Sequence, residues 1–134
     1  MISQLISAET VRRWCLRFPS VMIDHPFGPQ TTVYRDKTSR KMFALHWETV
    51  PAAVRRSLPE GLSPETVAVN LKAEPHLSEH LRAAHWQITG GYHMNKTHWS
   101  TVLMVVEGTL TERLLKDLIE DSYDLVVNGS KPLG

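Results

Sequence analysis

The side chains best suited to chemistry are concentrated in one segment, residues 90–99, which reads GGYHMNKTHW. An ammonium group, an amide and the backbone N–H groups of a glycine pair can bind an anion such as a phosphate, a carboxylate or a nucleotide, and an aromatic ring adds a stacking face. One functional alternative is therefore a small anionic-ligand site made by Tyr92, His93, Asn95, Lys96, His98 and Trp99, with Asp24 and His25 brought in by a bend at HPFG. In a competing interpretation the segment is a tight turn, in which Gly90 and Gly91 supply positive φ angles and the polar side chains bond to the backbone. The sequence leaves both interpretations open.

Metal binding and nucleophilic catalysis are less well supported by the same segment. His93 and His98 are five residues apart, which puts them on different sides of a helix or a strand, and the single cysteine, Cys15, is remote in sequence. Zinc normally needs three protein ligands, so we expect no metal. Ser100 and Thr101 lie close to His98, but no strained nucleophile elbow accompanies them. We therefore expect no catalytic residue and no cofactor, and the sequence favours a binding role over an enzymatic one.

Basic residues are distributed unevenly, although the formal net charge is only +1. Residues 1–56 hold nine Lys and Arg against four acids, whereas residues 57–134 hold six against ten. A basic turn between two predicted strands could meet phosphates without reading bases. The predicted nucleic-acid contacts are Arg35, Lys37, Arg40, Lys41 and Lys96. A solvated hairpin without a partner is the alternative, and a third possibility is a protein partner for the acidic last helix, through Glu112, Asp117, Glu120 and Asp121.

The elements that position these groups are predicted from hydrophobic periodicity and from turn residues. They are a helix over residues 8–17 capped by Ser7, a hairpin of strands 31–35 and 41–47, a short helix over 52–57, a strand over 66–72, a helix over 75–85, a strand over 101–107 and a last helix. Thr109 and Glu112 form a predicted capping box for that helix, and Gly129 is its expected stop. Residues 20–30 are predicted to form a bend instead of an element, because two prolines and a glycine interrupt them.

This order of elements predicts a single α+β domain over residues 1–134, with an ordered core over about 7–128. The sheet is expected to be largely antiparallel and to pack with three to four helices, while parallel pairing of some strands stays open. Hydrophobic residues make up 42% of the chain and charged residues 22%, as in a soluble globular protein. No stretch approaches the roughly 20 apolar residues that span a bilayer, so we expect a cytoplasmic protein without membrane contact.

Five short segments, taken in order, resemble the MmcQ/YjbR family. They are HPFG at 25–28, KMFAL at 41–45, VNLK at 69–72, GYHMNKTHW at 91–99 and SYDLVV at 122–127, within a resemblance that runs from about residue 11 to 127. The resemblance implies an α+β fold likened to a double-wing DNA-binding motif, and it implies duplex DNA as a partner. Together with the basic turn, it makes phosphate contact with duplex DNA our first functional hypothesis, and the small anionic-ligand site is the alternative. The connection over residues 46–66 is longer than the resemblance leads us to expect. Contacts that the family makes through this loop are therefore not carried over to this chain.

Overall fold

The computed structural model describes residues 4–56 and 59–128. Its elements are β1 (Gln4–Leu5), α1 (Ala8–Leu16), β2 (Val21–Asp24), β3 (Thr31–Asp36), β4 (Met42–Trp47), α2 (Ala52–Arg55), β5 (Ala68–Lys72), α3 (Pro75–Ala84), β6 (Ile88–Gly90), β7 (Trp99–Leu103), β8 (Val105–Val106) and α4 (Glu112–Asn128). Six strands form one sheet in the order β2-β3-β4-β5-β7-β6, and β1 pairs separately with β8. Every pairing is antiparallel in the described residues, so the predicted α+β class with a largely antiparallel sheet is confirmed.

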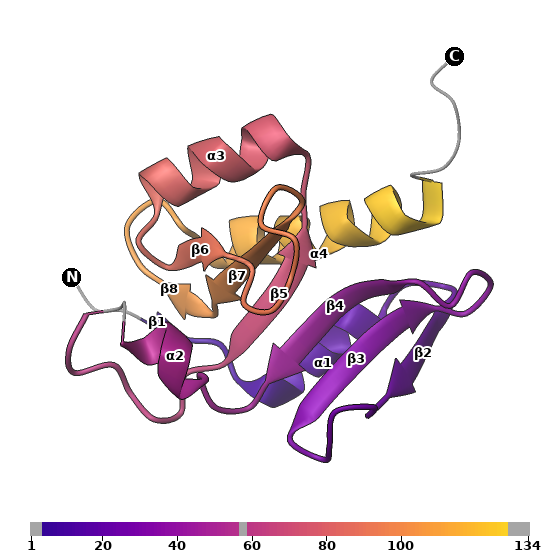
Figure 1. Cartoon of the computed structure of the whole chain (residues 1–134), viewed down its shortest axis with the longest axis horizontal. Coiled ribbons are helices and arrows are strands. Elements are labelled where there is room, and N and C mark those ends of the chain that lie inside the picture. Colours follow the sequence, from indigo (N-terminus) through magenta and orange to yellow (C-terminus); the bar gives the residue numbers. More distant parts are fainter. Residues whose placement is uncertain (1–3, 57–58, 129–134) are drawn as a thin grey trace.

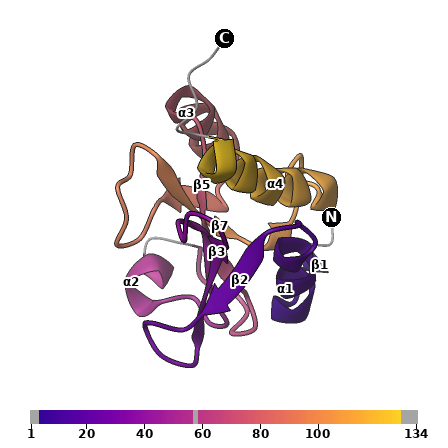
Figure 2. The ribbon, with the colours of Figure 1, turned by 90° about the vertical axis from the view of Figure 1, so that its right-hand side faces the viewer.

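Helices α1 and α4 pack side by side on one face of the sheet, as Figures 1 and 2 show from two directions. The main hydrophobic core fills the space between these helices and the strands. Helix α1 buries Val11, Trp14 and Cys15, which confirms its predicted apolar stripe. Burial raises the pKa of the Cys15 thiol, so Cys15 serves as a small apolar core residue. The other face of the sheet is left largely uncovered by helices, apart from the short α2 at one end (Figure 2).

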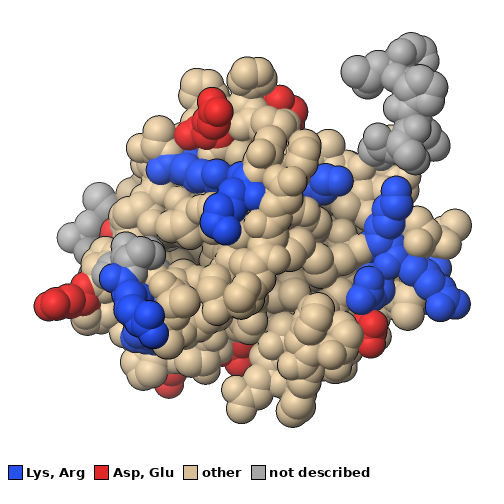
Figure 3. All heavy atoms as spheres, viewed as in Figure 1, with Lys and Arg blue, Asp and Glu red and all other residues tan. Residues whose placement is uncertain are grey.

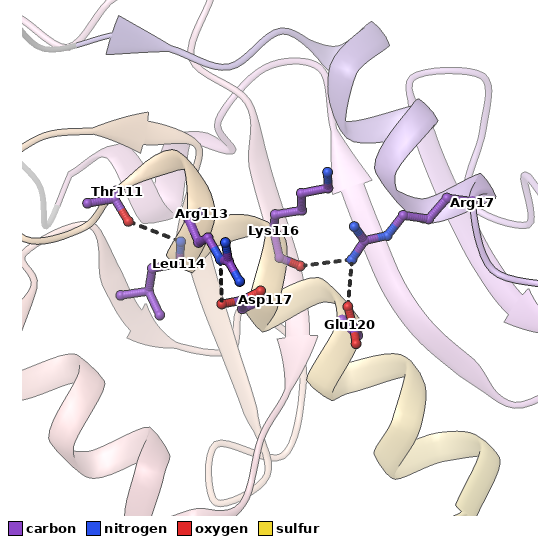
Figure 4. A network of polar contacts seen from close by, with 7 residues as sticks. All are labelled: Arg17, Thr111, Arg113, Leu114, Lys116, Asp117 and Glu120. Atoms are coloured by element: carbon purple, nitrogen blue, oxygen red, sulfur yellow. Dashed lines mark hydrogen bonds and ion pairs between the residues drawn. The ribbon is translucent and has the colours of Figure 1, made fainter.

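A polar bridge between α1 and α4 closes the helical layer at its surface. The guanidinium of Arg17 donates to the backbone carbonyl of Lys116 at 3.4 Å and to the carboxylate of Glu120 at 3.2 Å (Figure 4). Both side chains are partly exposed, so solvent screens the ion pair and its contribution to stability is small. The packing of the two helices therefore depends mainly on their buried apolar side chains.

A buried hydroxyl connects α4 to the sheet. Strand β4 contains a bulge, because Tyr34 faces Ala44 in the ladder and Arg35 faces Met42, which leaves Phe43 as an extra residue. Ser122 donates its hydroxyl hydrogen to the carbonyl of Phe43 at 2.5 Å and accepts from the backbone N–H of Lys72 at 2.9 Å. Helix α4 thus satisfies the carbonyl at the bulge of β4 and the N–H at the last residue of β5.

Several element boundaries differ from the sequence predictions. Residues 21–24, predicted as part of a bend, form β2, because β3 offers them a ladder to pair with. The predicted strand over residues 101–107 divides at Met104 into β7 and β8. Leu77, whose helical spacing with Leu81 and Ala84 predicts a buried stripe on α3, is 38% exposed, because Ser78 and Leu81 face the core instead. The predicted ends at Ser57 and Gly129 lie outside the described residues.

The start of α4 also differs from the predicted capping box. The helix begins at Glu112, and the Thr111 hydroxyl accepts a hydrogen bond from the N–H of Leu114 at 3.1 Å. Thr111 is therefore the N-cap, two residues after the predicted Thr109. The sequence TLTE contains both threonines, and the capping-box spacing selected the wrong one.

Candidate functional site

The uncovered face of the sheet holds a pocket of about 610 Å³, which we call the open-face pocket. Its apolar wall is made by Phe27, Met42, Leu45, Trp47, Pro51, Tyr92 and Met94. Its polar wall is made by Gln30, Thr31, Thr49, Asn70 and His93. The volume lies in the range of small-molecule sites, and a mainly apolar lining with a few polar groups is typical of them.

Strand order brings the floor of this pocket together. Thr31 on β3 lies opposite Trp47 on β4, and Leu45 on β4 lies opposite Asn70 on β5. Residues that face each other across an antiparallel ladder project to the same side of the sheet. Three neighbouring strands therefore present these four side chains on the face away from α1 and α4.

A buried amide fixes the loop after β6 above this floor. Asn70 donates its amide hydrogen to the carbonyl of Tyr92 at 3.0 Å and accepts from the Thr101 hydroxyl at 2.6 Å. The Thr101 oxygen in turn accepts from the backbone N–H of Tyr92 at 2.9 Å. Asn70 and Thr101 are both almost fully buried, so this closed set of bonds holds Tyr92 in one position at the pocket wall.

Aromatic rings line one side of the open-face pocket. The rings of Trp47 and Tyr92 meet edge to face, with centroids 5.8 Å apart and planes at 63°. The imidazole of His93 lies 3.9 Å from the Tyr92 ring. His93 has a φ of 58°, in the left-handed region that non-glycine residues rarely adopt. Such strain is concentrated at functional sites, where surrounding structure enforces it.

The glycine pair before this loop has a different role from the predicted one. Neither Gly90 nor Gly91 has a positive φ angle, which His93 has instead. A Cβ on Gly91 would lie 2.8 Å from the Cβ of Trp99 and 2.9 Å from its carbonyl oxygen. A Cβ on Gly90 would meet the flexible side chain of Lys96, at 3.1 Å. Gly91 is therefore required by close packing of two chain segments.

The predicted ligand residues are divided by the structure. Tyr92 and His93 line the open-face pocket, whereas Asn95, Lys96, His98 and Trp99 are not among its lining residues. The side-chain oxygen of Asn95 accepts a hydrogen bond from the backbone N–H of Thr97 at 2.9 Å. The backbone carbonyl of Asn95 accepts one from the backbone N–H of Trp99, also at 2.9 Å. This half of the segment is organised as a self-satisfied turn, as the competing interpretation expects.

Arg82 on α3, which the sequence did not suggest, holds that turn from outside. Its guanidinium donates to the carbonyls of Lys96 and Trp99 and to the hydroxyl of Ser100. A lone arginine on an amphipathic helix gives no signal of this role, because its partners are backbone groups of a distant loop.

Asp24 and His25 lie away from the pocket lining. Asp24 forms an ion pair with Arg35 at 3.2 Å and accepts from the backbone N–H of His25 at 2.8 Å. The His25 ring lies 3.5 Å from the Thr32 hydroxyl. The HPFG bend instead brings the neighbouring Phe27 to the pocket, with 68% of its surface exposed.

The predicted basic wing keeps three of its four residues free. Lys37, Arg40 and Lys41 are exposed on the β3–β4 turn, and no ion pair involves their side chains in the described parts of the chain. Arg35 is half-buried, paired with Asp24 and bonded to the carbonyl of Arg40. Its guanidinium is therefore committed within the fold.

Cationic side chains share the uncovered face of the protein in separate groups. Figure 3 shows Lys and Arg over the β3–β4 turn, over α3 with the loop between β6 and β7, and beside α2. Neutral surface lies between these groups, and Asp and Glu lie mostly near the edges of the view. The face is basic at its rim and neutral at its centre.

A buried histidine forms a second polar centre, on the helical side of the sheet. The Nδ1 of His46 lies 3.0 Å from the hydroxyl of Tyr34. Burial, with smaller contributions from Arg12 and His25, lowers the pKa of His46 to about 4. His46 is therefore neutral at pH 7, and it adjoins a small cavity of about 230 Å³ that Arg12 also lines.

The acidic side chains of α4 are partly neutralised within the fold. Asp117 lies 3.9 Å from Arg113, and Glu120 pairs with Arg17 (Figure 4). Burial, together with the carboxylates of its acidic neighbours Asp117, Asp124 and Glu120, raises the pKa of Asp121. Within residues 4–56 and 59–128, no group of three or more His, Cys, Asp or Glu is arranged to hold a metal ion, and no helix is long and apolar enough to cross a membrane.

The fold and the pocket define a class of small α+β proteins, in which an antiparallel sheet is covered by helices on one face and carries an aromatic pocket on the other. The model of the YjbR family matches residues 16–125. The chain belongs to the YjbR family, as the resemblance of its five short segments implied.

Two relatives match this chain over most of its length, and a third matches just under half of it. The uncharacterised protein YbdF of Escherichia coli O157:H7 is 38% identical over 121 residues, which cover 90% of this chain and 84% of that protein. The uncharacterised protein YyaQ of Bacillus subtilis is 32% identical over 106 residues, covering 76% of this chain and 82% of YyaQ. The uncharacterised protein YjbR of Escherichia coli K12 is 41% identical over 61 residues, covering 46% of this chain and 50% of YjbR.

Two crystal structures share the fold. Protein DR2400 of Deinococcus radiodurans gives a TM-score of 0.70 at 29% identity, covering 95% of this chain and 82% of that one. A protein of Pseudomonas syringae gives a TM-score of 0.71 at 30% identity, covering 90% of this chain and 99% of that one. These likenesses show the family and the fold, and the names of the relatives assign no activity.

Proposed function

We propose that this protein binds a small molecule in the open-face pocket. One observation carries the proposal. Four of the five segments that resemble the family contribute to the lining of the open-face pocket, although they are far apart in sequence. They supply Phe27 from HPFG, Met42 and Leu45 from KMFAL, Asn70 from VNLK, and Tyr92, His93 and Met94 from GYHMNKTHW. Core packing alone gives no reason for such segments to meet at a hollow on the uncovered face.

The lining also limits the chemistry of the ligand. It contains no Lys, Arg, Asp or Glu, so an anionic body would find no charged partner inside. Aromatic and Met side chains favour a flat, mainly apolar body, while the hydroxyls of Thr31 and Thr49 and the ring of His93 can bond to polar atoms at its edge. An acidic group on the ligand would have to reach the basic rim.

Bicyclic aromatic fragments test this proposal by NMR chemical-shift perturbation. We expect shifts at Tyr92 and His93, weaker binding in Phe27→Ala, and loss of binding in Thr49→Trp, whose indole would fill the pocket. Leu77→Ala is the matched control, since Leu77 is also exposed but lies on α3. Absence of shifts at the lining residues, or unchanged binding in Thr49→Trp, would contradict the proposal.

A second candidate function is contact with duplex DNA through the β3–β4 turn. The specific observation in its favour is the exposure of Lys37, Arg40 and Lys41, three cations without an ion-pair partner in the described residues. A turn of this kind contacts phosphates and carries no sequence preference of its own.

The salt dependence of binding tests this second candidate. If three phosphates are contacted, affinity should fall about 40-fold between 50 and 200 mM salt, roughly as the 2.7th power of concentration. The double variant Lys37→Glu with Arg40→Glu should lose most of this binding, whereas Arg113→Glu, on α4, should bind nearly as the wild type does. Equal binding of both variants, or no binding at 50 mM salt, would exclude duplex contact by the turn.

A further inference from the structure

We infer that the open-face pocket receives an unpaired nucleobase of a single-stranded nucleic acid, while the cations at its rim contact the flanking phosphates. This inference rests on the proposed function of the pocket and names its ligand class. It differs from the duplex candidate, because the contact that matters is a ring inside the pocket.

The aromatic wall suits a base, since every base has a planar face. Tyr92 meets Trp47 edge to face at 5.8 Å and carries His93 at 3.9 Å, so these rings are already held by one another. Phe27 is 68% exposed at the pocket and is free to cover an entering ring. Stacking on such side chains binds bases with little dependence on sequence.

Polar groups in the pocket are available for the edges of a base. The side chains of Gln30, Thr31, Thr49 and His93 form no hydrogen bond with other described residues. An amide, two hydroxyls and an imidazole offer both donors and acceptors, as the edge of an unpaired base requires. Asn70, by contrast, is fully used in holding Tyr92.

The positions of the cations agree with a backbone that crosses the rim. Lys41 directly precedes the lining residue Met42, and Lys96 follows the lining residue Met94 by two positions. Lys and Arg groups lie over both the β3–β4 turn and the loop between β6 and β7 on this face (Figure 3), while the lining of the pocket itself is neutral. A nucleotide chain needs this division, with charge outside for phosphates and rings inside for bases.

The open-face pocket is a hollow, which an unpaired base of a single strand can enter and a stacked base of a duplex cannot. The bases of a duplex are stacked on one another and their faces are inaccessible, so entry into a recessed pocket requires a base that is already unpaired or is extruded. A duplex laid on this face can meet only the rim. The pocket therefore adds affinity for a single strand and none for a duplex.

Fluorescence anisotropy with three labelled probes tests the inference: a ten-nucleotide oligothymidylate, a GC-rich hairpin duplex with a stem of ten base pairs, and a ten-unit abasic strand. We expect the oligothymidylate to bind at least tenfold more tightly than either other probe. Phe27→Ala or Thr49→Trp should weaken its binding about 5- to 100-fold, as expected for one stacked base, and should leave the abasic strand unaffected. The double variant Lys37→Glu with Arg40→Glu should weaken all three probes.

Equal binding of the oligothymidylate and the abasic strand, or equal or tighter binding of the duplex, would overturn the inference. Thermal unfolding of each variant confirms that it is folded, and Leu77→Ala should leave all three affinities unchanged. If bicyclic fragments bind in a Phe27-dependent manner and the strand does not, the inference is wrong and the proposed function stands. If neither binds, both are wrong.

Discussion

His46 illustrates how one buried side chain can couple stability to pH. It is 3% exposed on β4, and its neutral form bonds to the Tyr34 hydroxyl at 3.0 Å. Burial also raises the pKa of Tyr34, so its phenol stays protonated at neutral pH. The pair therefore meets as a neutral imidazole and a neutral phenol.

The lowered pKa of His46, about 4 in the fold against 6.5 when exposed, gives a prediction with a definite sign. Between these values the unfolded chain binds a proton that the fold rejects, so stability falls as pH falls. We expect a loss of about 2 kcal/mol between pH 7 and pH 5 from this residue, measured by urea unfolding. His46→Gln should remove most of this slope, whereas His80→Gln, an exposed control on α3, should keep it.

Gly91 gives a prediction about packing. Ala at this position would place its Cβ 2.8 Å from Trp99, against strand backbone that cannot move, so we expect a loss of about 2 kcal/mol in unfolding free energy. The adjacent variant Gly90→Ala meets only the flexible Lys96 side chain and should cost well under about 1 kcal/mol. Equal effects of the two variants would show that the close approach of Gly91 to Trp99 is unimportant.

At the scale of elements, the start of α4 tests the assignment of its cap. Thr111→Ala removes the acceptor for the N–H of Leu114 and should destabilise the protein by about 1 kcal/mol. Thr109→Ala, at the position that sequence spacing favoured, should change stability by less than about 0.5 kcal/mol, since no hydrogen bond to its side chain is formed in the described residues. Thermal or urea unfolding of the two variants decides between the threonines, and a larger effect at Thr109 would restore the capping box.

Elements with a clear apolar pattern were predictable from the sequence, as was the short helix α2, whereas the short strands β2 and β6 were not. Helices α1 and α3 and strands β3, β4 and β5 fall within one or two residues of their predicted ends, because burial of a face imposes a period. Strand β2 has four half-buried residues and β6 has three residues, so neither shows a clear alternation of buried and exposed side chains. Each is a strand because a neighbouring strand supplies its hydrogen bonds, which is information that local sequence does not contain.

At the scale of the whole molecule, Ser122 joins the two layers of the fold. Its hydroxyl serves the carbonyl of Phe43 and the N–H of Lys72, so Ser122→Ala would leave two backbone groups unpaired at once. We expect a loss of about 3 kcal/mol in unfolding free energy. Asp121→Asn is the neighbouring control and should be neutral or slightly stabilising, because it removes a crowded carboxylate. A loss below about 1 kcal/mol for Ser122→Ala would contradict this role.

The candidate site could be predicted only in part, because local sequence does not contain the order of the strands in the sheet. Tyr92 and His93 were predicted from residue types, and both line the open-face pocket. Trp47 and Asn70 were missed as site residues because they join the pocket through the order of β3, β4 and β5 in the sheet. Phe27 lies inside HPFG, one of the segments that resemble the family, but its chemistry gave no reason to prefer it to His25 two residues before it.

The shortness of the two outermost strands has a consequence for self-association. Strand β2 ends after four residues, just before Pro26, and β6 ends after three, where Gly91 turns the chain away. A free strand edge is a template on which another polypeptide can add backbone hydrogen bonds, and brief or interrupted edges offer few of them. Both margins of this sheet therefore offer little support for edge-to-edge aggregation, which protects a protein whose uncovered face already exposes Phe27.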